Sequence, residues 1–447
     1  MATRKLISKN IIANSTQYIG KDGEMWVDTD TNKLKISDGA TAGGVDLVGV
    51  GGGGATTWAA ITDINNAAGP DKIAVGRNAG STGQGTESVA IGDEAGKTTQ
   101  GNNATAVGNN AGETGQGVSS VAVGDVAGAL NQSTFAVAVG ASAGGITQGD
   151  SAVAIGTNAG YNTQSVSAVA IGGSAGSVSQ GASAVAIGSG SGSNIQGADA
   201  VAIGNGAGNG TDIITGQGEY AVAIGRDAGT TAQSTKAIAI GRDAGSTGQG
   251  TLTIAIGDQA GQTNQVAQAV AIGNQAGGDN QALQAVAIGQ QAGQTTQETL
   301  AIAIGTYAGR ITQGTKSVAI GNLAGNDTQS ANSVAIGEQA GVTTQSQHSV
   351  AIGALAGQTT QGESSVAIGK QAGKIDQGSS AVAIGNLAGV NNQHNNSIVI
   401  AASGSALDTA QAGQFLVKPV RNVAGALPAG FSQVAYNPTT GEFIYYG

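Results

Sequence analysis

The chain has 447 residues, of which 78 are Gly, 4 are Pro and none is Cys, and its net charge is −10. Only 10% of the residues are charged and 3% are aromatic, so the large side chains cannot fill one thick core, although they can fill a thin core repeated many times. We expect no nucleic-acid partner, no disulfide framework and no membrane insertion, because the sequence has no basic run, no Cys and no run of about eighteen apolar residues.

The amino-terminal segment, residues 1–50, predicts a small β module. Its first twenty residues lack the apolar run and the cleavage site of a secretion signal. Residues 19–48 read IGKDGEMWVDTDTNKLKISDGATAGGVDLV, which predicts a strand at 25–28, a turn at 29–32 and a returning strand at 33–37. The Gly-rich segment 51–70 that follows is expected to be a linker.

This module resembles the N-terminal module of phage receptor-binding proteins of the major tropism determinant kind. The shared pattern is G-E-x-x-V-D-T-D-T followed by D-G-x-T-x-G-G, and its matching residues are Gly23, Glu24, Val27, Asp28, Thr29, Asp30, Asp38, Gly39, Thr41, Gly43 and Gly44. The resemblance implies a trimeric module close to the virion, which would contact other virion proteins through residues 1–50.

Residues 71–400 repeat one sixteen-residue unit, with clear copies such as SAVAIGTNAGYNTQSV and SAVAIGGSAGSVSQGA. The Gly after each V-A-I triplet, called position 0 from here on, recurs every sixteen residues from Gly76 to Gly204 and from Gly225 to Gly385. This gives twenty copies. A fixed short period is typical of one structural unit stacked on itself, so we expect a rod.

Each copy predicts a flattened coil of two short strands and two turns. Positions −3 and −1 are Val or Ile except for Thr105, and position −2 is Ala in every copy, which is a strand pattern. Gly at positions 0 and +4 suits tight turns. Coils stacked in parallel at ~4.8 Å predict an all-β β-roll or β-solenoid about 95 Å long, with small β modules at both ends.

Two columns of the repeat predict more specific contacts. We expect Val and Ile at −3 and −1 to fill the interior, so that the Ala column at −2 points outward and forms an interface between copies of the chain. We expect the Gln at +8 to form an amide ladder between coils. That column includes Gln84, Gln100, Gln116, Gln132 and Gln265, and an insertion displaces one member to Gln217.

The SAVAIG repeats resemble the heads of trimeric autotransporter adhesins over residues 71–400, about three quarters of the chain. Those heads are left-handed parallel β-rolls, three of them side by side around one axis. The resemblance therefore implies a parallel homotrimer. The period here is longer than in that family, and the Gly at +4 and the Gln at +8 are features of this chain.

The last segment, residues 401–447, is expected to cap the rod, since six of the thirteen aromatic residues follow position 414. Its sequence QFLVKPVRN…VAYNPTTGEFIYYG predicts two strands that flank a turn at 437–441. It resembles a segment of phage and giant-virus fibre proteins, F-x-V-x-P-I-R-N…L-x-Y-N-x-T-T-x-E-I-x-Y. The matching residues are Phe415, Val417, Pro419, Arg421, Asn422, Tyr436, Asn437, Thr439, Thr440, Glu442 and Tyr445.

The residue pattern nominates no catalytic, cofactor-binding or metal-binding residue. The two His, His348 and His394, lie in different columns nearly three coils apart, and Asp does not recur in one column. The one irregularity is five extra residues within 209–220, which form either a binding loop or a tolerated loop with Tyr220 packed beneath it. We therefore expect no enzyme activity.

The expected function is that of a structural and adhesive fibre or spike of a bacteriophage virion. Residues 401–447 are the expected contact with a host cell-surface glycan or protein, through Arg421, Asn437, Thr439 and Thr440, with Tyr220 as a further candidate. One alternative is a bacterial trimeric surface adhesin, which the expected lack of a secretion signal disfavours. The other is a polysaccharide depolymerase tailspike, which would need paired carboxylates in a groove.

Overall fold

The computed structural model describes residues 71–210, 216–402 and 404–419, with shorter stretches at both ends. In the amino-terminal module, β1 (Met25–Asp28) pairs antiparallel with β2 (Lys33–Ile36), and β2 pairs with β3 (Val45–Asp46). The predicted strand pair is confirmed, while the linker at 51–70 lies outside the described residues.

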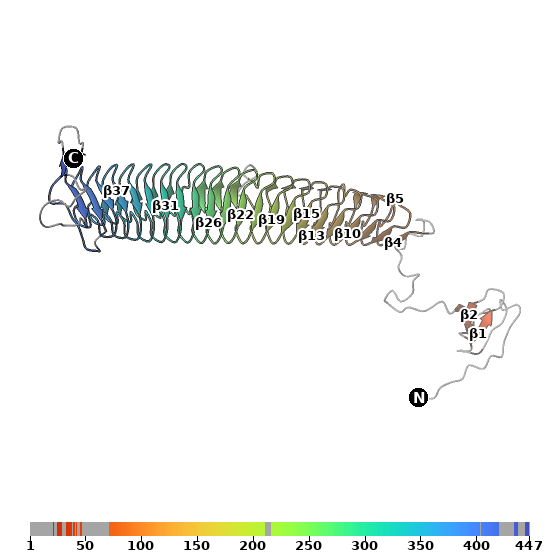
Figure 1. The fold of residues 1–447 in the computed structure, drawn as a ribbon. Helices are drawn as coiled ribbons and strands as arrows, with labels where there is room; N and C mark the ends of the chain where they lie inside the picture. The colour runs from red at the N-terminus through yellow and green to blue at the C-terminus, as the bar shows by residue number, and fades with distance from the viewer. Residues whose placement is uncertain are drawn as a thin grey trace, which may run out of the picture.

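The repeats form a parallel β-solenoid of about 21 coils (Figure 1). Each V-A-I triplet is a strand, and equal positions of successive triplets pair in parallel, so that Ala154 lies beside Ala138 and Ala170. These strands form the first sheet: β4 (Ile73–Val75), β6 (Val89–Ile91), β8 (Thr105–Val107), β10 (Val121–Val123), β11 (Val137–Val139), β13 (Val153–Ile155), β15 (Val169–Ile171), β17 (Val185–Ile187), β19 (Val201–Ile203), β20 (Val222–Ile224), β22 (Ile238–Ile240), β24 (Ile254–Ile256), β26 (Val270–Ile272), β27 (Val286–Ile288), β29 (Ile302–Ile304), β31 (Val318–Ile320), β33 (Val334–Ile336), β35 (Val350–Ile352), β37 (Val366–Ile368), β38 (Val382–Ile384), β39 (Ile398–Ala401) and β40 (Phe415–Lys418).

On the opposite wall of each coil a short strand ends at the Gln of position +8, and these strands form the second sheet. Its strands fall into separate groups of three, four, three and five. They are β5 (Thr82–Gln84), β7 (Thr98–Gln100) and β9 (Thr114–Gln116); β12 (Thr147–Gln148), β14 (Thr163–Gln164), β16 (Ser179–Gln180) and β18 (Ile195–Gln196); β21 (Thr231–Gln233), β23 (Thr247–Gln249) and β25 (Thr263–Gln265); and β28 (Thr296–Gln297), β30 (Thr312–Gln313), β32 (Thr328–Gln329), β34 (Thr344–Gln345) and β36 (Thr360–Gln361).

The first sheet continues beyond the last V-A-I triplet. β39 pairs with β38, and β40 pairs in parallel with β39, so the ladder extends past residue 400 to Lys418. In this pairing Phe415 and Val417 lie beside Ile398 and Ile400, which continues the −3 and −1 columns into the last strand. Beyond it, β41 (Gln433–Tyr436) pairs antiparallel with β42 (Phe443–Tyr446), as the sequence predicts.

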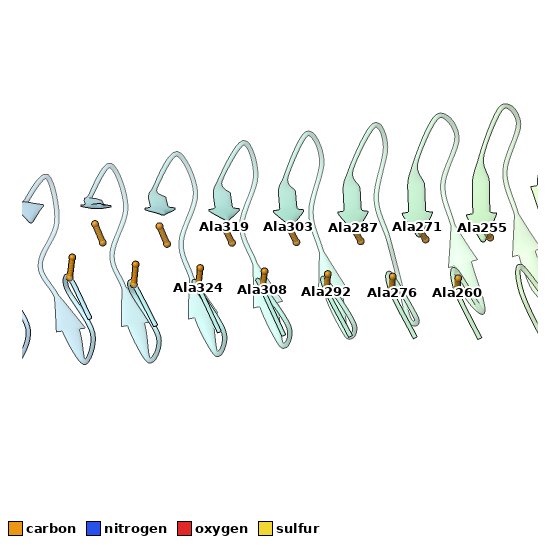
Figure 2. Packing of buried hydrophobic residues seen from close by; sticks show 14 of the residues in the cluster. Ala255, Ala260, Ala271, Ala276, Ala287, Ala292, Ala303, Ala308, Ala319 and Ala324 are labelled. Carbon is orange, nitrogen blue, oxygen red and sulfur yellow. The ribbon is translucent and has the colours of Figure 1, made fainter. Parts of the chain in front are cut away.

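The prediction of which side chains fill the interior is wrong. Ala at −2 is buried in every coil and packs against the Ala at +3, in two rows that face each other across the coil (Figure 2). The Val and Ile at −3 and −1 point outward and stay partly exposed, with Ile91 at 40% and Ile384 at 38%. The Ala column therefore cannot be an interface between copies of the chain.

The reason for this inversion is the small volume of the interior. In each coil the inward positions hold Ala at −2, Ala or Ser at +3, a small residue at +12 and one Gln at +8, and these Gln side chains are the largest that are fully buried. A pair of β-branched side chains at −3 and −1 would exceed this space, and an overpacked core is costly. Volume, rather than hydrophobicity, thus decides which face of the strand points inward.

Two glycines per coil are required by close approach as well as by positive φ. A Cβ on Gly257, at position 0, would lie 2.5 Å from the carbonyl oxygen of Gly273 in the next coil. A Cβ on Gly261, at +4, would lie 2.8 Å from Oε1 of the buried Gln265. The Gly at +4 therefore makes room for the Gln at +8, which explains why the two columns occur together.

Position +7 divides the coils into two conformational classes. In one class φ at +7 is positive, with Gly, Asn or Asp there in most coils, such as Gly115 and Asn131. In the other class +7 is an ordinary extended strand residue, and Thr predominates, as at Thr344. This division follows residue chemistry, since Asn and Gly tolerate the left-handed region and β-branched residues do not. Thr99, with φ of 57°, breaks the rule and lies between Gly83 and Gly115 in the neighbouring coils.

We predict that Thr99→Asn stabilises the rod locally, because a β-branched residue in the left-handed region is strained by about 1–2 kcal/mol. Hydrogen exchange of residues 82–116 should slow by up to about tenfold. The matched variant Thr344→Asn replaces an extended Thr and should bring no such gain. Equal effects of the two substitutions would show that the backbone at 99 is not strained.

Candidate interaction surfaces

The Gln column at +8 lies inside the coils and bonds in three directions. The two N–H groups on Nε2 of Gln265 are shared among three acceptors, which are the carbonyl of Ile254 at 2.9 Å, that of Ala269 at 3.3 Å and Oε1 of Gln281 at 3.0 Å. The first two bonds fix the side chain against its own coil, and the third connects it to the next coil. The amide group thus satisfies buried carbonyls that water cannot reach.

The ladder of Gln side chains is interrupted near its start and at the insertion. The bonds between side chains begin at Gln132, which donates to Gln148 at 3.0 Å. They stop at the displaced Gln217, which accepts from Gln196 at 3.1 Å but donates to the carbonyls of Val201 and Ala221 and not to Gln233. Gln84, Gln100 and Gln116 bond to carbonyls of their own coils without a side-chain bond to the next Gln. The Oε1 atoms that accept no hydrogen bond are those of Gln84, Gln100, Gln116, Gln132 and Gln233.

Gln265→Leu should destabilise the rod by about 2–4 kcal/mol, because it leaves the carbonyl of Ile254 and the amides of the neighbouring Gln side chains without partners. The measurement is the shift of the urea midpoint of the full chain. Gln290→Leu is the control, since Gln290 is exposed, and its effect should stay within about 0.5 kcal/mol. A midpoint for Gln265→Leu equal to that of the control would exclude a stabilising ladder.

The outward Val and Ile side chains of positions −3 and −1 form one continuous surface, which we call the Val/Ile stripe. Parallel in-register pairing puts each side chain directly beside its equivalent in the next coil, from Ile73 to Val417. Members such as Ile203, Ile256 and Ile304 are 36% exposed. The length of the stripe is set by about 21 coils spaced ~4.8 Å apart, and its width by the ~7 Å between the −3 and −1 side chains of one strand. The product is an apolar surface of about 700 Å².

This size sets the stripe apart from ordinary surface hydrophobics. The largest apolar patch of a typical monomer covers about 300–600 Å², and larger ones mark interaction sites. A stable interface buries about 800 Å² on each partner, which the stripe approaches by itself. The stripe is therefore the strongest candidate for an interaction surface among the described residues.

The candidate Tyr220 is an exposed surface residue. Its side chain is 52% exposed and its φ is 58°. The ammonium of Lys236 lies 5.9 Å from the centre of its ring, on the neighbouring coil. Residues 211–215 of the insertion lie outside the described residues, as do the candidates Arg421, Asn437, Thr439 and Thr440.

The charged groups near the first coils form ion pairs at the surface rather than an acid–base site. Arg77 pairs with Asp93, and Lys97 lies 2.9 Å from Glu94 and 3.6 Å from Glu113. Hydrogen bonds from Arg77 and Lys97 lower the pKa of Asp93 and of Glu94, which keeps both carboxylates ionised. A general acid of a glycosidase requires a raised pKa instead.

Neither His joins a site, although both are exposed. Nδ1 of His394 lies 3.0 Å from the hydroxyl of Thr409, while His348 lies on the outer turn of its coil with φ of 59°. Within the described residues no group of three or more His, Cys, Asp or Glu could hold a metal ion. The same part of the chain contains no helix that could cross a membrane.

Comparison with known proteins adds no relative: no protein-family model, no curated protein and no solved structure matches this chain.

Proposed function

We propose that this chain is a structural and adhesive fibre or spike protein of a bacteriophage virion that works as a parallel homotrimer. The Val/Ile stripe is the observation that carries the proposal, because a rod with one continuous apolar surface is best stabilised by copies of itself. The resemblance of both end segments to phage fibre proteins supports the virion as its location.

The proposal assigns one task to each segment. Residues 1–50 attach the fibre to other virion proteins, and the solenoid provides length and stiffness. Residues 401–447 contact a glycan or protein of the host surface, since the solenoid surface outside the Val/Ile stripe is mostly small and polar and offers few of the aromatic and Arg anchors that dominate binding energy.

The geometry of the stripe favours self-association. The same two side chains recur on every coil, so a second copy in parallel and in register meets Val or Ile at each step. Transfer of a fully exposed Val or Ile into an apolar contact contributes about 1.5–3 kcal/mol, and the more exposed Ile at −1, such as Ile203 and Ile304, retain 36% of that exposure. Summed over the rod, the gain exceeds the cost of association.

Single Cys substitutions test this contact cleanly, because the chain has no Cys of its own. Under oxidation Ile304→Cys, on the stripe, should form disulfide-linked pairs of chains. Thr312→Cys, which is exposed on the second sheet of the same coil, should not. In a trimer only two of three Cys can pair, so at most two thirds of the chains should migrate as dimers, whereas a dimer would be linked completely.

Sedimentation of the unmodified chain provides the second readout. A single species of three chains at micromolar concentration is expected. A stable monomer, or efficient cross-linking of Thr312→Cys instead of Ile304→Cys, would contradict self-association through the stripe.

Host contact is tested with the full chain as a competitor of adsorption by the phage whose particles contain it. Arg421→Ala should weaken the competition about tenfold or more, as expected for an Arg anchor in a binding site. Tyr220→Ala should leave the competition unchanged. The reverse result would place recognition on the shaft beside the insertion, and absence of the chain from purified particles would overturn the virion assignment.

A further inference from the structure

The direction of one backbone N–H distinguishes the two classes of coil. Where φ at +7 is positive, the +7 N–H donates backward to the preceding coil, as from Asn131 to the carbonyl of Thr114 at 2.9 Å. Where +7 is extended, it donates forward to the following coil, as from Thr147 to the carbonyl of Asn162 at 3.1 Å. Thr360 and Asp376, where the two classes meet in the opposite order, make neither bond. The peptide group before +7 is therefore flipped between the two classes.

At two places a backward-donating coil is followed by a forward-donating coil. Between the coils of Asn131 and Thr147, the two N–H groups point away from each other, and the carbonyls of Leu130 and Ile146 accept no backbone hydrogen bond from the described residues. The second wall there keeps the bridge Gln132↔Gln148 and the backbone hydrogen bonds that flank it, from Gln148 to the carbonyl of Asn131 at 3.2 Å and from Ser133 to that of Gln148 at 2.9 Å, but it lacks the bond of the +7 N–H.

The second place lies between the coils of Asn280 and Thr296. Asn280 donates backward to the carbonyl of Thr263 at 2.9 Å, and Thr296 donates forward to that of Ile311 at 2.9 Å. The bridge Gln281↔Gln297 and the backbone hydrogen bonds that flank it, from Gln297 to the carbonyl of Asn280 at 3.3 Å and from Ala282 to that of Gln297 at 2.8 Å, are again kept, and the bond of the +7 N–H is again missing. We call these two places junctions.

The first sheet is not interrupted at either junction. β10 pairs with β11 across the first, and β26 pairs with β27 across the second, each over all three residues of the strand. The Gln ladder also crosses both, with Gln132 bonded to Gln148 and Gln281 bonded to Gln297 at 3.0 Å. Each junction thus keeps the full pairing of the first sheet and lacks one backbone hydrogen bond of the second.

We propose that the two junctions are hinges, at which the second sheet opens locally while the first sheet and the Gln ladder keep the coils together. Opening of the second wall alone bends the rod with the first sheet on the concave side. A break in backbone pairing lowers the free energy needed to open the adjacent coils, because fewer interstrand hydrogen bonds must be broken.

The residue at +7 sets the position of a hinge. A block is a run of neighbouring coils that belong to the same class. When the coil at the edge of a block changes class, the junction moves by one coil, and the number of hydrogen bonds between strands is unchanged. The intrinsic preference of the +7 side chain then determines the class of that coil, because Asn accepts positive φ whereas Thr does not. Inside a block the neighbouring coils decide instead, as they do for Thr99.

The test is hydrogen exchange of the full chain, compared between Asn280→Thr and the wild type. In the wild type, second-sheet segments that flank the junction between residues 280 and 296 should exchange about five to ten times faster than those in the middle of a block. In Asn280→Thr the fast segments should lie one coil nearer the N-terminus, between residues 264 and 280.

Two further variants keep the test decisive. Thr296→Asn should move the fast segments one coil the other way, to between residues 296 and 312. Asn264→Thr changes a coil inside a block, flanked by Gly248 and Asn280, and should leave the fast segments in place. Uniform exchange along the wild-type array, or fast segments that stay in place in both Asn280→Thr and Thr296→Asn, would overturn the proposal.

Discussion

The narrow interior of the coil is the constraint on which the rest of the structure depends. One Gln amide crosses it from the second sheet to the carbonyls of the first, and only methyl-sized side chains fit beside that amide. This explains the Ala at −2 and +3, and it explains the Gly at +4, where a Cβ would meet the Gln side chain. Because the interior is this narrow, the larger Val and Ile side chains fit only on the outer surface.

Such a core differs in kind from an ordinary hydrophobic core. Burial of Ala removes little apolar area per residue, so cohesion along the axis depends heavily on hydrogen bonds between coils. Gln265, within an uninterrupted run of the ladder, satisfies its amide on both sides, whereas the oxygen of Gln84 in the first coil accepts no hydrogen bond. Stability is therefore expected to rise from the ends of the array toward its middle, as in other stacked repeats.

The period, the strands and the parallel stacking could be predicted from the sequence, because the V-A-I triplet and the Gly positions recur without drift. The inward face could not be assigned by hydrophobicity, since both faces of a V-A-I strand are apolar. The signal that decides is the constancy of Ala, which marks a position limited in volume. The constancy of Ala does not mark an interface between copies, because it reflects the space beside the Gln amide.

The alternation of Gly or Asn with Thr at +7 was also visible in the sequence, but its meaning depends on neighbouring coils. Thr99 adopts positive φ against its own preference because Gly83 and Gly115 on either side do so. A single side chain therefore does not determine the conformation of its coil, and the block of coils does. This cooperativity places junctions where blocks meet, and a sequence pattern taken one repeat at a time cannot reveal them.

The two walls of the coil consequently have different mechanical characters. The first sheet is paired without a break from β4 to β40 and carries the Val/Ile stripe, while the second sheet is divided into groups. If copies associate through the stripe, the unbroken sheets lie next to one another along the axis and the divided sheets face solvent. The first sheets then bear tension along the fibre, and the second sheets can open without loss of contact between the copies.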